Sequence, residues 1–427
     1  MDFTFLIPST VIVLGAFFLI KLKAFFIFHP VRTFKRFVEA IKAPNAFANL
    51  TLALAGTLGV GNIFGVAAGI AVGGPGSVFW LVVASVFSSV IKYAESVTSA
   101  DHLAYDGRVN VGGMMYVLHT SFGKRGKTLG SLYAILCLLL SLFMGCAFQC
   151  SAVISSSKGI IEADTFALSL TLTATVCLLL AFGKKKIEKT TSLLIPIATI
   201  IYVFLALSVI ISNGDRLQDA ITDIFTGAFE PLSVGCGFGA FIFNSAMREG
   251  FSKGVLSNEA GVGTSAMANV RTRHISSCDS GLFGMCEVFF DSVVLCTLTG
   301  LAILTGVENT KDFKTGTELV NATFKASFLG NVSEILLLLC ILCFAISTVI
   351  CWYYYGGVCM EYLCRKRKRA AFTFVFVLFV FIGPYITEVI TLRVIDVLLT
   401  AMSLLTAACL IKNSDRVVAL SEINGII

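Results

Sequence analysis

Charge is scarce in this sequence. Lys, Arg, Asp and Glu make up 14% of its 427 residues, whereas 56% are hydrophobic and the mean hydropathy is +0.89. Soluble domains carry about a quarter charged residues, so this composition excludes a soluble globular protein of this length. Proline is also rare, with 7 residues against 37 phenylalanines, as suits helices that face lipid. We therefore expect an all-α polytopic membrane protein.

The motifs of common enzymes are missing as well. The sequence has no HExxH, no P-loop and no GxSxG, and Gly59-x-Gly61-x-x-x-Gly65 departs from the dinucleotide-binding spacing. The apolar runs hold no carboxylate pair suited to acid–base catalysis, and the four histidines lack the spacing of metal ligands. These absences argue against an enzyme.

Disulfide bonds are not expected despite 14 cysteines, because most of them lie inside apolar runs. Cys340 and Cys343 have CxxC spacing, yet no polar or basic neighbour would activate a thiolate there. We interpret the cysteines as buried free thiols.

Apolar runs of about 17–25 residues predict eleven transmembrane helices. They lie near residues 4–22, 46–72, 76–100, 127–157, 164–183, 190–213, 234–249, 280–306, 331–363, 371–387 and 391–411. Arg248 and Glu249 cut the seventh span short, and we interpret residues 251–273 as a semi-polar hairpin on one membrane face. The first span lacks the basic start and cleavage site of a signal peptide, so we expect it to be retained.

Basic and acidic loops alternate along the whole chain, and this alternation predicts the orientation. Lysine and arginine gather at residues 21–45, 108–127, 184–189 and 365–369, whereas the intervening loops carry mainly aspartate and glutamate. We expect the N-terminus outside and the C-terminus in the cytoplasm of a cell (inner) membrane. The basic run Arg365–Arg369 directly follows a predicted span, so we interpret it as a signal for the orientation of the chain in the membrane. We therefore expect membrane lipid, and no nucleic acid, as a partner.

Beyond the first span, ten spans divide into two groups of five that enter the membrane from opposite faces. Each group opens on a glycine-rich apolar run, Gly56–Gly74 in the first and Gly235–Gly239 in the second. Glycine costs about 1 kcal/mol relative to alanine within a helix, so such runs favour a discontinuous helix. We predict two inverted five-helix repeats with broken first helices. The domains would be an extra helix with a basic segment (1–45), a first repeat (46–213), a second repeat (214–412) and a cytoplasmic tail (413–427).

The first glycine run also contains the polar residue Asn62. At a break, this amide and free backbone carbonyls suit a hard cation of modest charge density. The amides of Gly59–Gly61 would begin a second half-helix, whose positive end suits a carboxylate. A cation site beside a carboxylate site describes an amino acid zwitterion with a coupling ion. The alternative is that the glycines only let helices pack closely.

Polar side chains in other apolar runs are candidates with open alternatives. Gln149 could contact a substrate or hydrogen-bond another helix. Ser347 and Thr348 could face a ligand or bond back to the previous helical turn. Trp352, one turn later, could form a lid over a small ligand.

Charged residues inside the apolar runs are fewer. Lys92 and Glu95 fit a paired or snorkelling role near the cytoplasmic end of their span, with a proton relay as the alternative. Asp291 lies deep in an apolar run and is therefore a candidate functional residue by default.

Several of these motifs together resemble the alanine/glycine:cation symporters. Gly61–Gly76, followed by Phe79-Trp80 and Lys92-Tyr-Ala-Glu95, is similar to the signature of that family. Ser257–Gly263 resembles its SNEAG-x-G element, and Phe290-Asp291-Ser292 with Trp352-x-Tyr-Tyr-Gly356 continues the likeness. The resemblance runs from about residue 46 to 411.

The resemblance implies the fold of the amino acid–polyamine–cation transporters and Na⁺-coupled, sometimes H⁺-coupled, uptake of a small amino acid such as alanine or glycine. It places these residues of the first, third, sixth and eighth core helices at the substrate: Gly59, Val60, Gly61, Gln149, Gly237 and Trp352. A more distant likeness to neurotransmitter:sodium symporters implies a set of cation ligands: Ala55, Leu58, Ser347 and Thr348 for one Na⁺, with Thr57 and Asn62 near a second cation or the substrate carboxylate. Asn258, Glu259 and Asp291 are further functional candidates.

The chain departs from the family pattern at four positions. The family usually has threonine in place of Val60, asparagines in place of Cys146 and Ser151, and glutamate in place of Gly357. These losses remove polar contacts from the expected pocket and leave the exact amino acid open. We predict an importer that works by alternating access; a non-accumulating channel or an amino acid sensor on the same scaffold is the alternative.

Overall fold

The computed structural model of the protein describes residues 5–42, 50, 54, 56–102, 104–106, 109–158, 160–181, 184–229, 244–268, 276–313, 315–364 and 369–427. Its regular structure is helical apart from one short antiparallel hairpin, in which β1 (Ala104–Asp106) pairs with β2 (Val109–Val111). Every cysteine among the described residues is free, as the sequence predicts, but the predicted burial is wrong for Cys177, which is exposed, and Cys343 is only partly buried.

Six stretches of the described residues are helices long and apolar enough to cross a membrane. They are α6 (Gly76–Asp101), η3 to α9 (Gly123–Ser157), the apolar part of α11 (Leu194–Ser212), α16 to α17 (Ser277–Gly306), α19 (Asn331–Cys364) and α21 (Glu388–Lys412). Four shorter apolar helices accompany them: α1 (Leu6–Lys21), η2 with α5 (Gly61–Gly73), α10 (Thr165–Ala181) and α20 with η9 (Arg369–Tyr385). The chain is therefore an all-helical, multi-pass membrane protein. The seventh predicted span, 234–249, lies mostly outside the described residues, so the count of eleven stays a prediction.

The long stretches are subdivided, and shorter elements connect them. The composite stretches contain η3 (Gly123–Arg125), α8 (Gly126–Leu142), η4 (Phe143–Phe148), α9 (Gln149–Ser157), α16 (Ser277–Val288), η7 (Phe289–Cys296) and α17 (Thr297–Gly306), while α11 as a whole runs Lys184–Ser212. The remaining elements are α2 (Phe25–Phe28), α3 (Pro30–Ile41), α7 (Met114–Ser121), η5 (Gly214–Arg216), α12 (Leu217–Ala228), α14 (Ser245–Asn258), α15 (Ser265–Ala268), η8 (Thr310–Asp312), α18 (Gly316–Lys325) and α22 (Ser414–Ile423).

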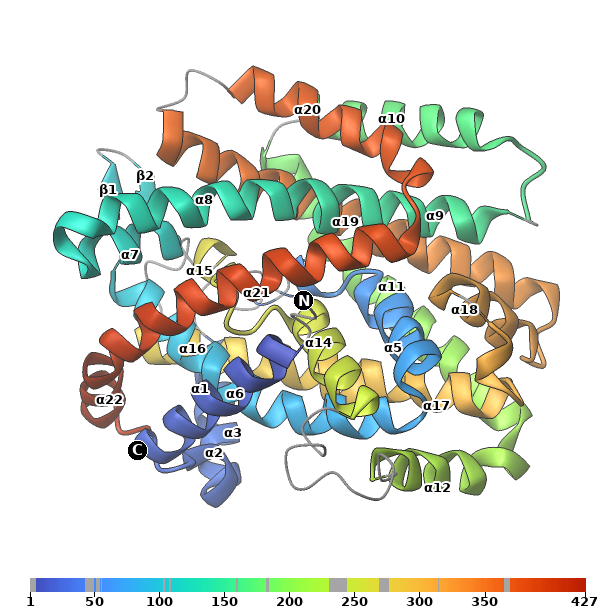
Figure 1. Ribbon diagram of the computed structural model, residues 1–427, viewed down its shortest axis with the longest axis horizontal. Helices are drawn as coiled ribbons and strands as arrows, with labels where there is room; N and C mark the ends of the chain where they lie inside the picture. The colour runs from blue at the N-terminus through green and yellow to red at the C-terminus, as the bar shows by residue number, and fades with distance from the viewer. Residues whose placement is uncertain are drawn as a thin grey trace.

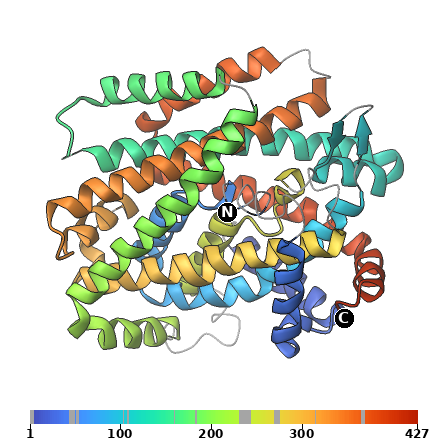
Figure 2. The ribbon, with the colours of Figure 1, turned by 180° about the vertical axis from the view of Figure 1, so that it is seen from behind.

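The helices form one bundle with distinct edges (Figure 1). Along one edge α10 and α20 lie side by side, and the view from behind in Figure 2 shows the same pair. At the opposite corner α2, α3 and α22 gather near the C-terminus. There α22 is tied to α6, because Arg416 forms a bidentate pair with Asp101 and the Tyr93 hydroxyl is hydrogen-bonded to that of Ser421.

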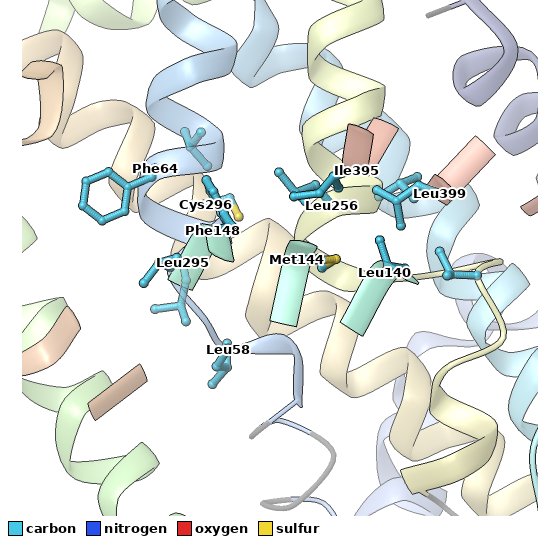
Figure 3. Packing of buried hydrophobic residues seen from close by; sticks show 14 of the residues in the cluster. Leu58, Phe64, Leu140, Met144, Phe148, Leu256, Leu295, Cys296, Ile395 and Leu399 are labelled. Carbon is cyan, nitrogen blue, oxygen red and sulfur yellow. The ribbon is translucent and has the colours of Figure 1, made fainter. Parts of the chain in front are cut away.

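Three of the described segments wind with the wider turns of a π-helix: η2 (Gly61–Gly65), η4 and η7. Such turns often mark functional sites, because the extra residue shifts side chains out of the regular ladder. The segments η2 and η7 pack together, and α14 packs against both. These segments contribute apolar side chains to one buried cluster, part of which Figure 3 shows, with Phe64, Leu256 and Leu295 labelled.

The predicted hairpin on a membrane face is wrong for the described part of residues 251–273. Instead α14 continues to Asn258, and residues 250–258 are all buried, against α6 and α5 among others. Its polar residues are satisfied from neighbouring helices; Ser252 and Lys253 bond to Asp396 of α21 at 2.9 and 3.3 Å. The prediction failed because these partners lie far away in the sequence, so a segment with polar residues could be buried in the core.

Candidate functional site

The first glycine run contains a break in regular helix. Residues 58–60 form a bend and a turn, after which η2 and α5 (Val66–Gly73) continue the segment. The Asn62 side chain closes this turn, because its Oδ1 accepts a hydrogen bond from the Gly59 N–H at 3.4 Å. Residues 56–62 are all buried, so the backbone groups freed by the break face protein and not lipid.

Gln149 reaches the break from another helix. It is the first residue of α9, directly after the π-turns of η4, and it is buried. Its Oε1 accepts a hydrogen bond from the Val60 N–H at 3.3 Å, and its Nε2 donates to the Met144 carbonyl at 3.2 Å. The bond to another segment was one of the two alternatives predicted for this amide. It also positions the amide at the break.

The third wall of the site comes from α19. A methyl group at Gly59 would lie 2.7 Å from Thr348 Oγ1 and 3.4 Å from Gln149 Oε1, so the three residues meet closely. Ser347 bonds back to the carbonyls of Cys343 and Phe344 in the preceding turn, as one alternative predicted.

Trp352 lies one turn further along α19. Its side chain is fully buried, and its Cβ packs so closely on η4 that a methyl group at Gly145 would lie 2.2 Å away. Its ring meets the Tyr355 ring edge to face, with centroids 5.5 Å apart. The indole therefore closes the space between α19 and η4.

Polar atoms near this meeting point are left without partners. Within the described residues, Thr57 Oγ1, Thr348 Oγ1 and Trp352 Nε1 are buried and make no hydrogen bond. A buried polar atom without a partner costs about 1–3 kcal/mol, so Thr57 Oγ1 at the break, Thr348 Oγ1 against Gly59 and Trp352 Nε1 one turn further along α19 are candidate partners of a polar ligand. Together with Gln149 these groups can form hydrogen bonds with both the carboxylate and the ammonium group of a small zwitterion.

Asp291 lies on the other side of Asn62, in the π-turns of η7. Its Oδ1 accepts from Asn62 Nδ2 at 2.5 Å, and its Oδ2 accepts from the hydroxyls of Ser257 at 2.5 Å and Ser292 at 2.9 Å. All of these donors are neutral, and Asp291 is fully buried. A buried carboxylate is costly without a counter-charge, so this group is suited to a monovalent cation.

A second interruption follows α14. The helix ends at Asn258, and the next residues include three with positive φ: Glu259 at 53°, Gly261 at 77° and Gly263 at 93°. The Asn258 side chain supports this turn by accepting from the Ala260 N–H at 2.9 Å and donating to Ser292 at 3.0 Å. The interruption lies close to the first break, since a methyl group at Gly61 would be 3.6 Å from the Leu256 carbonyl.

Two predicted site residues, Ala55 and Gly237, lie outside the described residues. Of the rest, the structure gathers Thr57, Leu58, Gly59, Val60, Gly61, Asn62, Gln149, Ser347, Thr348, Trp352, Asp291, Asn258 and Glu259 around the two interruptions. Sequence reasoning missed Ser257 as the partner of Asp291, because a hydroxyl in a polar stretch carries no signal of its own. Among the described residues no group of three His, Cys, Asp or Glu side chains could hold a transition metal.

Comparisons with known proteins give a consistent result. The model of the sodium:alanine symporter family matches residues 2–422. The sodium/alanine symporter AgcS of Methanococcus maripaludis is 31% identical over 366 residues, covering 84% of this chain and 79% of the relative. The sodium/proton-dependent alanine carrier protein of a Bacillus species is 28% identical over 341 residues, covering 76% and 74%. A manganese transporter variant from Eremococcus coleocola shares the fold, with a TM-score of 0.53 at 15% identity, over 85% of this chain and 76% of that one.

Proposed function

Because this chain belongs to the sodium:alanine symporter family, we propose that it is a secondary transporter that imports alanine, glycine or another small neutral amino acid with Na⁺. The proteins it resembles are transporters by name, and no catalytic motif competes with this assignment. The orientation is the one that the lysine and arginine distribution predicts, with the C-terminus in the cytoplasm.

The proposal is carried by the unpartnered polar atoms at the first break. Thr57, Thr348 and Trp352 supply hydroxyl and indole groups, and Gln149 supplies an amide, from three segments of the chain. The substrate carboxylate would take the buried N–H groups of Gly59–Gly61 in place of the Asn62 and Gln149 side chains that now accept from Gly59 and Val60, and the ammonium group would take hydroxyl and carbonyl oxygens.

We place the coupling cation beside Asp291 and Asn62. The carboxylate supplies the charge, the Asn62 amide supplies an oxygen after rotating away from Gly59, and Ser257 and Ser292 orient the carboxylate by donating to it. Na⁺ at this position would release the Gly59 N–H for the substrate, which couples the two ligands through one side chain. A second Na⁺ would use the Leu58 carbonyl with Ser347 and Thr348.

In the transport cycle, Na⁺ would bind first and fix the conformation of the first break, and the substrate would bind next. Trp352 and the second interruption at Glu259–Gly263 would then close around the substrate before it is released to the other side. On this proposal the chain keeps the two five-helix repeats that the sequence predicts, 46–213 and 214–412, and the first break opens the first repeat. The break predicted at 235–239 for the second repeat lies outside the described residues, and the interruption at Glu259–Gly263 lies further along that repeat.

Tryptophan fluorescence tests the site directly, because the chain has only Trp80 and Trp352. In a Trp80→Phe variant the emission reports Trp352 alone. Alanine added with Na⁺ should change this emission, whereas alanine with K⁺ or lysine with Na⁺ should not. A lack of response to every small neutral amino acid in the presence of Na⁺ would overturn the proposed site.

A further inference from the structure

The chain turns sharply where it leaves α1. Lys23 and Ala24 both have positive φ, at 53° and 42°, a conformation that residues with a side chain disfavour. This turn separates the apolar helix α1 from α2 and α3, which lie at the corner of the bundle near the C-terminus (Figure 1). Because α1 is an apolar helix of the bundle, we expect α2 and α3 to lie at the membrane surface, on the side where the basic loops gather.

One face of α3 is fixed to α16. The Phe37 ring meets the Phe283 ring edge to face, with centroids 5.9 Å apart, and Ala40 belongs to the same apolar cluster. Arg36 forms an ion pair with Asp279 of α16 at 3.1 Å. This face of α3 is therefore occupied by the protein itself.

A second face of α2 and α3 is apolar and exposed. Phe28, Val31 and Phe34 are 71, 67 and 66% exposed. Val31 and Phe34 are three residues apart and therefore lie on the same side of α3. A short helix with one apolar face and basic residues beside it is typical of a segment that lies in the membrane interface.

Basic residues accompany this apolar face. Residues 21–42 contain six lysines and arginines against a single glutamate, Glu39. Two of the six are paired with acidic side chains, Lys21 with Asp415 at 2.5 Å and Arg36 with Asp279. The other four form no ion pair with any residue that the structure describes: Lys23, Arg32, Lys35 and Lys42. This surface therefore carries positive charge that the described part of the chain does not neutralise.

A cavity of about 700 Å³ lies between α3 and the C-terminal segment. His29, Arg32 and Lys35 line it on one side, and Asn424 and Gly425 line it from the C-terminal segment. Arg32 links the two sides, because its Nη2 donates to the Gly425 carbonyl at 2.8 Å. A guanidinium group has five N–H donors, so this bond leaves others that can bind an anion.

We propose that this cavity binds the headgroup phosphate of an anionic phospholipid, while Phe28, Val31 and Phe34 contact its acyl chains. Arg32 and Lys35 supply the positive charge for the phosphate. On the orientation that the sequence predicts, the lipid belongs to the cytoplasmic leaflet. The site shares no residue with the transport site, so the inference goes beyond the proposed function and does not depend on the substrate or the coupling ion.

A phospholipid fits this surface better than a soluble anion does. A free phosphate or an acidic peptide would use the basic residues and leave the apolar side chains Phe28, Val31 and Phe34 exposed to water. A phospholipid uses both features, with its phosphate in the cavity and its chains on the adjacent apolar face. Each lysine or arginine near an anionic membrane surface strengthens binding roughly fivefold, so the charge should also give a preference over a zwitterionic lipid.

Native mass spectrometry of the purified full-length protein tests the preference for an anionic headgroup. With equal amounts of phosphatidylglycerol and phosphatidylcholine of the same acyl chains, the wild type should retain phosphatidylglycerol about tenfold more. Arg32→Gln/Lys35→Gln should lose most of this preference. The control Lys124→Gln/Arg125→Gln removes two exposed basic residues of η3 on the same predicted side and should keep it. Equal retention of the two lipids by the wild type, or an equal loss in both double variants, would overturn the proposal.

A single variant separates the charge from the structure of the cavity. Lys35→Gln keeps the bond between Arg32 and the Gly425 carbonyl, and it should still lower the retention of phosphatidylglycerol roughly fivefold. Unchanged retention in Lys35→Gln would contradict the role of this charge. Displacement of phosphatidylglycerol from the wild type by an equal concentration of inorganic phosphate would show a site for a free anion and overturn the lipid site.

Photolabelling locates the bound lipid. A phosphatidylglycerol with a photoreactive group on its acyl chain, next to the glycerol, should label residues 25–41 of the wild type. Labelling there should fall about tenfold in Val31→Ser/Phe34→Ser and persist in Phe34→Leu, which keeps an apolar side chain. Labelling confined to other segments, or unchanged labelling in Val31→Ser/Phe34→Ser, would overturn the inference.

Discussion

Asp291 shows how a single residue combines predictable and unpredictable features. A carboxylate deep in an apolar run stands out in the sequence, so its importance could be predicted from hydropathy alone. Its set of neutral hydrogen-bond donors could not be predicted, because two of the three, Asn62 and Ser257, lie 229 and 34 residues away in the sequence. Only the fold shows that no lysine or arginine among the described residues pairs with it.

Replacing Asp291 by asparagine keeps the shape of the side chain and removes the charge that we assign to cation binding. We expect the Na⁺ concentration for half-maximal alanine uptake to rise about tenfold or more, which corresponds to roughly 1.4 kcal/mol. Uptake measured over a series of Na⁺ concentrations checks this value. Asp215→Asn, an exposed aspartate, is the control, and an unchanged Na⁺ dependence in Asp291→Asn would refute the role.

Gln149→Ala should separate substrate binding from cation binding. The change leaves the Val60 N–H without its acceptor at 3.3 Å and enlarges the space beside Gly59. We expect KM for alanine to rise about tenfold while the Na⁺ dependence changes little. Gln218→Ala, at the other glutamine of the chain and exposed, controls for the substitution. A parallel loss of Na⁺ affinity would show that the amide does not act on the substrate alone.

At the scale of elements, the two interruptions decide the architecture of the site. Glycine density predicted the first one correctly as a place where regular helix ends, since residues 58–60 form a bend and a turn. For the second, the glycine run at 235–239 lies outside the described residues, whereas the interruption that the structure shows follows Asn258. The sequence did indicate this interruption through Gly261 and Gly263, because these glycines adopt a positive φ that residues with a side chain disfavour.

The first break is also sensitive to added volume. Gly59→Ala would place a methyl group 2.7 Å from Thr348 Oγ1, so that α19 and the break must separate. Overpacking of this kind costs about 1–3 kcal/mol, and we expect uptake to fall more than tenfold while the protein still folds. Gly357→Ala, on α19 with no atom within 4 Å of the added methyl group, should retain uptake. Size-exclusion chromatography and uptake check both variants, and full activity of Gly59→Ala would contradict the close approach.

For the whole molecule, hydropathy predicted where most helices lie but not how they pack. Charge scarcity and long apolar runs are local properties, and ten of the predicted spans coincide with described apolar helices. Packing depends on partners far apart in the sequence, such as Lys253 with Asp396 and Tyr93 with Ser421. For the same reason the sequence could not show that residues 251–258 belong to the core.

Accumulation of alanine in proteoliposomes tests the central claim, coupling of a small amino acid to Na⁺, most directly. The purified full-length protein should concentrate radiolabelled alanine inside the vesicles when Na⁺ is higher outside, and should only equilibrate it when K⁺ replaces Na⁺. Uptake that never exceeds the external concentration under an inward Na⁺ gradient would contradict coupling and favour a channel. Binding of alanine without any flux would contradict transport and favour a sensor.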